Sequence, residues 1–131
     1  QAVIPDMIAA NKGAIANMSS DCAVMAVPGA GAYMAAKSAI YSLTKSIALE
    51  FAPQNIRVNA LGPGPIDTPI LKSGRTEAEY AKALEAFTEN LPIGRLGQPE
   101  EVAAVLDFLL SDRSAYMTGQ IIHPNGGQLM W

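Results

Sequence analysis

The sequence contains two Tyr-x-x-x-Lys pairs, and each could place a phenol beside an ammonium on one face of a helix. Tyr33 precedes Lys37 in "YMAAK", and Tyr41 precedes Lys45 in "YSLTK". Residues four apart are neighbours on a helix surface. A free tyrosine has a pKa of about 10, and a nearby cation lowers the pKa of a phenol, which eases proton exchange near neutral pH. The chemistry indicated is proton transfer to or from a substrate oxygen.

Position favours Tyr33 over Tyr41 as the reactive group. The two tyrosines are eight residues apart, which separates them by ~80° around a helix and ~12 Å along it, so one small site cannot use both. Tyr33 lies where a predicted helix begins, just after a predicted strand that ends in "NMSS". Tyr41 lies two turns deeper, where a helix packs against its neighbours.

The elements that would position these residues alternate between short apolar stretches and longer helical stretches. Apolar residues at 33, 36, 40, 43 and 47 form the helical stripe of the first long helix. Strands separated by helices favour parallel pairing with right-handed crossovers, an α/β layered fold. The predicted strands cover 13–20, 55–65 and 119–127, and the predicted helices cover 31–51, 75–91 and 99–112.

In such a sheet, ligands bind beyond the carboxyl ends of the strands. Three segments therefore become candidate site regions: Met18 to Asp21, Gly62 to Pro69, and the residues after His123.

Several motifs, in order, resemble the short-chain dehydrogenase/reductase family. "GAIANMSS", twelve further residues and "YMAAK" resemble its active-site block, in which a Ser precedes the catalytic Tyr by thirteen positions; here that residue is Ser20. The same interval counted back from Tyr41 reaches Pro28, which cannot serve. "NALGPGPIDTP" (59–69), "GRLGQPEEVA" (94–103) and "MTGQIIHPNGG" (117–127) resemble later segments of the family, so the resemblance covers nearly the whole chain.

The resemblance implies an NAD- or NADP-dependent oxidoreductase that interconverts an alcohol and a ketone or aldehyde by hydride transfer. Tyr33 would be the acid/base, and Lys37 would support it and hold the cofactor's ribose hydroxyls. Ser20 would hydrogen-bond the substrate oxygen, while Ser19 should point the other way and satisfy backbone groups.

The family also implies cofactor contacts and a fold. The Pro63–Gly64 bend would let the backbone pass close to a flat ligand. The nicotinamide carboxamide would bind to the backbone of Ile66 and to the hydroxyl of Thr68. Residues from about 70 to 91 would form a substrate lid. The fold implied is the C-terminal part of a Rossmann-type doubly wound parallel sheet, with about three parallel strands and flanking helices.

Residues 1–131 are expected to be the C-terminal half of a single domain, without the N-terminal dinucleotide-binding half. The sequence begins at Gln1 and has no Gly-rich phosphate loop after a first strand, because "GAGAY" precedes the tyrosine rather than a phosphate-binding helix. The chain is therefore predicted to be inactive alone and to need the missing half. The alternative is a non-catalytic binding or assembly module, against which the set of Ser20, Tyr33 and Lys37 argues.

Composition excludes several classes of function. The formal charge of −3 and the lack of a Lys/Arg run argue against nucleic acid, and no apolar run reaches a membrane span. Cys22 is the single cysteine and can form no intrachain disulfide, which suits a reducing, cytoplasmic compartment. Because His123 is the single histidine, a Cys/His metal site within the chain is excluded. We expect Cys22 to be a packed thiol and His123 to end a strand and pack locally.

A homodimer or homotetramer is expected because the helix at 31–51 carries more apolar surface than one sheet needs, including Tyr41 and Leu43. Met130 and Trp131 at the end of the chain point the same way.

Overall fold

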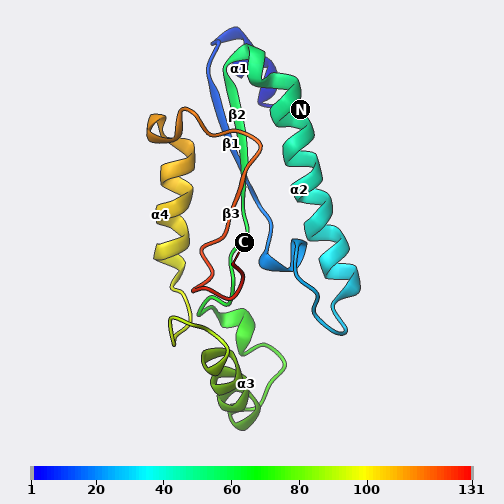
Figure 1. The fold of residues 1–131 in the computed structure, drawn as a ribbon, viewed down its shortest axis with the longest axis vertical. Coiled ribbons are helices and arrows are strands. Elements are labelled where there is room, and N and C mark those ends of the chain that lie inside the picture. Colours follow the sequence, from blue (N-terminus) through cyan, green and yellow to red (C-terminus); the bar gives the residue numbers. More distant parts are fainter. Residues whose placement is uncertain (1, 131) are drawn as a thin grey trace.

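The computed structural model describes residues 2–130, so Gln1 and the predicted contact residue Trp131 lie outside the described part. Its centre is a three-stranded parallel sheet in the order β1-β2-β3, which confirms the predicted α/β fold (Figure 1). The strands are β1 (Gly13–Met18), β2 (Ile56–Leu61) and β3 (Ile121–Ile122).

The third strand is much shorter than the predicted 119–127. Only Ile121 and Ile122 pair with β2. Pro124 has no N–H to give a ladder, and Gly126 and Gly127 have positive φ angles of 63° and 85°. Regular strand pairing therefore ends at Ile122, and one further backbone bond, from Gly64 N to Pro124 O, joins the loops beyond it.

Strand β2 is the central strand of the sheet, and most of its residues are buried. Ile56, Val58, Ala60 and Leu61 are completely buried, as expected for a central parallel strand covered on both faces. The buried Asn59 donates from Nδ2 to the Met117 carbonyl oxygen (2.8 Å) and accepts from the Gln120 N–H (3.0 Å). These bonds hold the segment that leads into β3 against β2.

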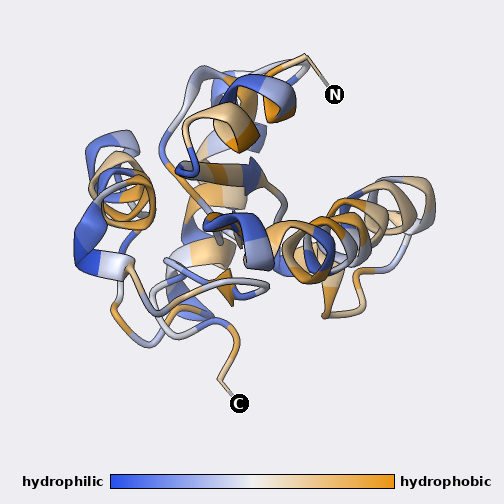
Figure 2. Cartoon of the chain, turned by 90° about the horizontal axis from the view of Figure 1, so that it is seen from above, coloured by the Kyte–Doolittle hydropathy of each residue, from blue (hydrophilic) through white to orange (hydrophobic). Residues whose placement is uncertain are grey.

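Two long helices cover opposite faces of this sheet, as the view along the strands shows (Figure 2). They are α2 (Gly31–Phe51), between β1 and β2, and α4 (Pro99–Leu110), between β2 and β3; the short α1 (Ile4–Ala9) precedes β1. The connections β1-α2-β2 and β2-α4-β3 both move one strand in the same direction across the sheet. Because their helices lie on opposite faces, one crossover is right-handed and the other is left-handed. The prediction of right-handed crossovers is therefore wrong for one of them. Residues 62–98 form a long segment between β2 and α4, and this segment brings the chain to the other face of the sheet. The preference for right-handed crossovers describes shorter connections, in which the helix directly follows the strand.

The face of α2 that packs on the sheet matches the predicted stripe only in part, because Ile47 packs against the core but other members do not. Thr44 and Ala48 are the buried residues of the helix, while Leu43 is 56% exposed. Thr44 Oγ1 accepts a hydrogen bond from Asn17 Nδ2 (2.9 Å) and donates to the Ile40 carbonyl oxygen (2.8 Å). A small polar residue therefore lies buried between helix and sheet, where the pattern of large apolar residues did not indicate it.

The excursion after β2 carries α3 (Glu77–Glu89), which lies beyond the carboxyl ends of the strands (Figure 1). Its start is fixed by a capping box: Thr76 Oγ1 accepts from the Glu79 N–H, and Glu79 Oε2 accepts from the Thr76 N–H (2.8 Å). The bond from the Thr76 N–H lowers the pKa of Glu79. The predicted lid at about 70–91 is thus built around a well-started helix.

Candidate active site

The three segments predicted from topology meet at the carboxyl edge of the sheet. Backbone hydrogen bonds run from Asp21 N to Pro63 O (3.1 Å), from Gly62 N to Ile122 O (2.8 Å) and from Gly64 N to Pro124 O (3.2 Å). The loops after β1, β2 and β3 are therefore joined side by side. Residues that are far apart in the sequence can act together here.

Ser20 and Tyr33 line one cavity of about 380 Å³ at this edge. Ser20 is buried, and its Oγ accepts from the Cys22 N–H (3.2 Å), which starts a single 3₁₀ turn at Asp21–Ala23. This bond uses one lone pair of the hydroxyl and leaves its O–H able to donate. The geometry thus places one fixed hydroxyl and one phenol in the walls of the same cavity.

Lys37 lies beside Tyr33, as predicted. Its Nζ is 5.7 Å from the centroid of the Tyr33 ring and donates to the Met18 carbonyl oxygen at the end of β1 (3.3 Å). The second pair has the same arrangement, with Lys45 Nζ 4.6 Å from the Tyr41 ring centroid. Tyr41 does not line the cavity that holds Ser20. The cavity, and not the contact between tyrosine and lysine, distinguishes the two pairs.

Ser19 ties the strand to the helix that carries Tyr33. Its hydroxyl donates to the Lys37 carbonyl oxygen (2.9 Å), and its backbone N–H donates to Leu61 O (2.7 Å). It does not line the cavity with Ser20. Its side chain therefore satisfies a backbone group, as expected, and fixes α2 relative to the end of β1.

The predicted cofactor contacts divide into two groups. Pro63 and Gly64 line the cavity with Ser20 and Tyr33, whereas Ile66 and Thr68 do not. Ile66 forms a parallel bridge with Gly97 in which Gly97 N donates to Pro65 O and Asp67 N donates to Gly97 O. In a parallel bridge of this kind the N–H of the central residue points to the opposite side. The Ile66 N–H is thus directed away from Gly97, and Thr68 Oγ1 lies 3.4 Å from the Ile66 carbonyl oxygen.

Gly64 is required by its neighbour in the fold, whatever ligand is near. A Cβ at this position would lie 2.9 Å from both Cα and Cβ of Asn125, closer than real side chains approach. The predicted reason for this glycine was the approach of a flat ligand. The structure gives contact with the loop after β3 as the constraint.

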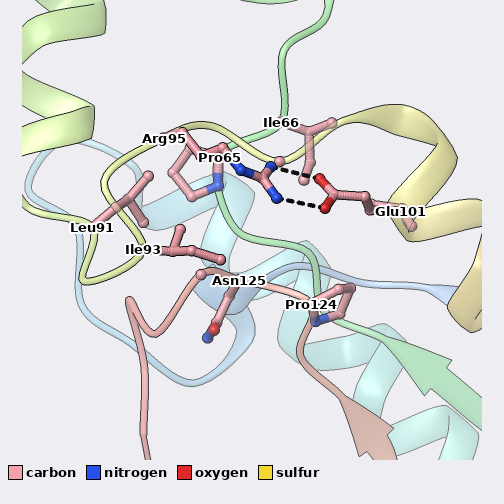
Figure 3. Close-up of a pocket in the computed structure, with 11 residues that line it drawn as sticks. Pro65, Ile66, Leu91, Ile93, Arg95, Glu101, Pro124 and Asn125 are labelled. Atoms are coloured by element: carbon pink, nitrogen blue, oxygen red, sulfur yellow. Dashed lines mark hydrogen bonds and ion pairs between the residues drawn. The ribbon is translucent and has the colours of Figure 1, made fainter.

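A smaller hollow of about 130 Å³ adjoins the cavity through Pro65, between the loops after β2 and β3 and the segment that leads from α3 into α4 (Figure 3). Arg95 and Glu101 close one side of it with two hydrogen bonds, Nη1 to Oε2 (2.8 Å) and Nη2 to Oε1 (2.7 Å). The Arg95 guanidinium lowers the pKa of Glu101 to about 2, and the Gln98 N–H adds to the effect. This pair joins the segment that returns from the lid to the start of α4.

Glu101→Gln is expected to reduce stability at neutral pH and to have a smaller effect in acid. The folded pKa lies below the ordinary 4.5, so the contribution of the carboxylate is present above about pH 4.5 and is lost as the pH falls towards 2. Denaturant unfolding of wild type and variant at several pH values in this window measures the difference. A difference between the two proteins that stays constant with pH would contradict the assignment.

Asp21, the residue after Ser20, forms a buried pair with His123 that the sequence did not predict. His123 Nδ1 is 2.7 Å from Asp21 Oδ1 and 3.0 Å from the Gly62 carbonyl oxygen, and the two side chains are 8% and 2% exposed. His123 was expected to pack locally, which is wrong: its partner lies 102 residues earlier in the chain. Both residues follow strands that end at the same edge, so the topology could have indicated the contact.

The Asp21–His123 pair joins the ends of all three strands. Because Gly62 O can only accept, His123 Nδ1 carries a hydrogen and shares it between this carbonyl and Asp21. Burial raises the pKa of Asp21 above its ordinary 3.8, and the hydrogen bond from His123 opposes that rise. Since Asp21 is adjacent to Ser20, the pair holds the turn that presents the Ser20 hydroxyl.

Two further expectations concern Cys22 and metals. Cys22 is a free thiol that is half-buried in the cavity wall, so it is less enclosed than the packed thiol expected. Within residues 2–130, no three His, Cys, Asp or Glu side chains cluster as metal ligands would. In the same part of the chain, none of the helices has the length and apolar character needed to cross a bilayer.

Residues 1–128 match the family described as enoyl-(acyl carrier protein) reductase. A 3-oxoacyl-(acyl-carrier-protein) reductase of Thermotoga maritima is 46% identical over 127 residues, which are 97% of this chain and 50% of that protein. A cyclohexanol dehydrogenase of Acinetobacter sp. is 43% identical over 116 residues, which are 88% of this chain and 43% of that protein.

Solved structures show the same relationship. A gluconate 5-dehydrogenase from Burkholderia cenocepacia, in complex with NADP and tartrate, superposes with a TM-score of 0.89 at 33% identity, over 98% of this chain and 49% of that one. The chain therefore spans about half the length of the curated relatives and solved structures that it matches.

Proposed function

Because the chain belongs to the short-chain dehydrogenase/reductase family, we propose that it carries the catalytic half of an NAD- or NADP-dependent oxidoreductase that interconverts an alcohol and a ketone or aldehyde. The observation that supports this most is the shared cavity of Ser20 and Tyr33, with the Lys37 ammonium next to the phenol. A fixed hydroxyl, a phenol and a cation can position a carbonyl oxygen and protonate it, while the nicotinamide would supply the hydride.

Tyr33 is the proposed acid/base. Reduction of a carbonyl leaves negative charge on its oxygen, and the phenol of Tyr33 donates a proton to that oxygen; oxidation of the alcohol runs the same transfer in reverse. The Lys37 ammonium stabilises the phenolate that remains. It is oriented by its bond to the Met18 carbonyl oxygen, so the cation stays near the ring while the proton moves.

Ser20 is proposed to position the substrate. Its O–H donates to the carbonyl oxygen beside the phenol, which fixes the direction of proton transfer and stabilises charge as it develops. The hydroxyl is itself held by the Cys22 N–H. This preorganisation reduces the cost of ordering the site when the substrate binds.

The residues present fit a nicotinamide dinucleotide at the edge of the cavity. The cofactor, when bound, accepts or supplies the hydride. Lys37 and Tyr33 would hold its ribose hydroxyls, Pro63 and Gly64 would flank the ring, and the outward-facing Ile66 N–H and the Thr68 hydroxyl would bind the carboxamide. Residues 1–131 include no Gly-rich phosphate loop, so phosphate binding is assigned to a further N-terminal half.

The test is nicotinamide-linked turnover by the full-length protein, with NADH and NADPH supplied separately and a set of ketones as substrates. Ser20→Ala is expected to lower kcat by about 10²–10³-fold, as does removal of one donor to an oxyanion elsewhere. Ser42→Ala, an exposed serine on α2 outside the cavity, is the matched control and should leave kcat near wild type. Cofactor binding without turnover on any carbonyl or alcohol would instead favour the non-catalytic binding or assembly module.

Self-association is part of the proposal. Within α2, Leu43 and Leu49 are 56% and 83% exposed, and such apolar side chains favour contact with a second copy in a homodimer or homotetramer. Analytical ultracentrifugation of the full-length protein would measure its oligomeric state.

A further inference from the structure

The walls of the Ser20–Tyr33 cavity bear on the chemical class of its substrate. Four apolar side chains from two separate parts of the chain face it: Met25 and Val27 from the loop before α2, and Leu71 and Phe87 from the lid. Pro65 adds a further apolar side chain to the lining, next to Pro63, which is assigned to the nicotinamide ring. A ligand whose carbonyl meets Ser20 and Tyr33 therefore has its remaining atoms against hydrocarbon.

The charges around this cavity disfavour an anionic substrate. No Lys or Arg is among the described residues that line it. The Lys37 ammonium lies over the Tyr33 ring and is bonded to the Met18 carbonyl oxygen. The Lys72 ammonium, next to Leu71 in the chain, lies over the Tyr80 ring. The carboxyl group in the wall, Asp21, is buried and hydrogen-bonded to His123. A substrate carboxylate or phosphate would lose its hydration with no cation to replace it.

The cavity is also poor in partners for a polyhydroxylated substrate. Apart from Ser20 and Tyr33, which are assigned to the reacting oxygen, the polar side-chain groups in the wall are the Cys22 thiol, the Gln128 amide and the paired Asp21. Each substrate hydroxyl buried there without a partner would lose its hydration uncompensated, which weakens binding. The cavity volume of about 380 Å³ is near the lower end of the range of about 300–1,000 Å³ for small-molecule sites.

We propose that this site takes a compact, uncharged and mainly hydrocarbon ketone or secondary alcohol, bound by Met25, Val27, Leu71 and Phe87. The inference rests on the proposed oxidoreductase function and adds the class of substrate to it. The lid contributes half of these side chains, so it selects the substrate by apolar contact rather than by a charge.

The experiment compares two ketones that differ by one carboxylate group, using the full-length protein and its preferred nicotinamide cofactor. The first is cyclohexanone, and the second is the same ring with a carboxylate opposite the carbonyl. The kcat/KM for the uncharged ketone is expected to exceed that for the keto acid by at least about 100-fold, because the pocket leaves the carboxylate unpaired.

Phe87→Lys adds a cation to the lid wall of the cavity. It is expected to reduce the preference for cyclohexanone by at least about tenfold, because the ammonium pairs with the substrate carboxylate. Ala86→Lys is the matched control: Ala86 is an exposed neighbour on α3 that does not line the cavity, so the preference should stay at the wild-type value. Circular dichroism and thermal unfolding of both variants establish that the helix is retained.

The outcomes separate this inference from the proposed function. Failure to turn over any ketone or alcohol contradicts the oxidoreductase assignment itself. Turnover of the keto acid at least as fast as cyclohexanone leaves that assignment intact and overturns the inference about substrate class. An unchanged preference in a folded Phe87→Lys variant overturns the assignment of the lid side chain to the substrate wall.

Discussion

Replacing Tyr33 by Phe is expected to lower kcat by about 10²–10⁴-fold, the usual contribution of one general acid–base group. The substitution removes only the phenolic oxygen. The ring that Lys37 Nζ approaches to 5.7 Å is kept, and the side chain is 50% exposed, so folding should be unaffected. The measurement is nicotinamide-linked turnover by the full-length protein, with cofactor binding followed by fluorescence quenching in the same samples.

Tyr41→Phe is the matched control, because the second pair has the same sequence spacing and an even shorter distance between ammonium and ring, 4.6 Å. Tyr41 does not line the cavity with Ser20, so its phenol has no substrate to protonate, and kcat should remain close to wild type. Retained turnover in Tyr33→Phe, or loss of turnover in Tyr41→Phe, would remove the basis for the proposed acid. Loss of cofactor binding in Tyr33→Phe would show that the phenol acts mainly in binding.

The choice between these tyrosines could be made from the sequence because it depends on order along the chain. Where a strand ends and a helix begins is visible in "NMSS" and in the apolar run that follows, and parallel strands bring their carboxyl ends to one edge. The helix predicted at 31–51 is α2, with the same limits. The segments that follow the three strands could therefore be identified as site regions from the sequence alone.

Features that depend on how the elements pack could not be predicted in this way. The buried face of α2 is set by Thr44 and Ala48, two small residues that an apolar stripe does not reveal. The opposite hands of the two crossovers depend on the return path of residues 62–98. The division of the predicted cofactor residues, with Pro63 inside the cavity wall and Ile66 outside it, depends on the bridge from Ile66 to Gly97.

The Asp21–His123 pair is the clearest case of a contact that the topology allowed but the pattern did not suggest. A lone histidine after a strand is usually accommodated by its neighbours, and an aspartate after Ser20 is consistent with a solvated turn. His123 Nδ1 and Asp21 Oδ1 come within 2.7 Å only because β1 and β3 end at the same carboxyl edge of the sheet. The pair fixes the turn that carries Ser20, so its loss should lower stability.

Asp21→Ala is expected to lower the free energy of unfolding by about 1.5–3 kcal/mol, the usual range for a hydrogen bond to a charged group. A buried pair of full charges would cost more, about 3–5 kcal/mol. The smaller range applies because Gly62 O still accepts from His123 Nδ1 (3.0 Å) after the substitution. Denaturant unfolding of the full-length protein at neutral pH measures it. The matched control is Asp112→Ala: its exposed pair with Lys12, in which the aspartate side chain is 79% exposed, should contribute about 0–1 kcal/mol.

The pH dependence of the same carboxyl group gives a second, independent check, and its sign is opposite to that of Glu101. The pKa of Asp21 is raised in the folded state by burial, above the ordinary 3.8. A group with a raised pKa contributes most below its unfolded pKa and loses that contribution as the pH rises through the folded value. The stability of wild type relative to Asp21→Asn, whose amide oxygen can still accept from His123 but cannot ionise, should therefore decrease as the pH rises from below 3.8. A relative stability that instead increases over this window would mean that the attraction of His123 outweighs burial, and that the pair holds the turn at Ser20 as an ion pair.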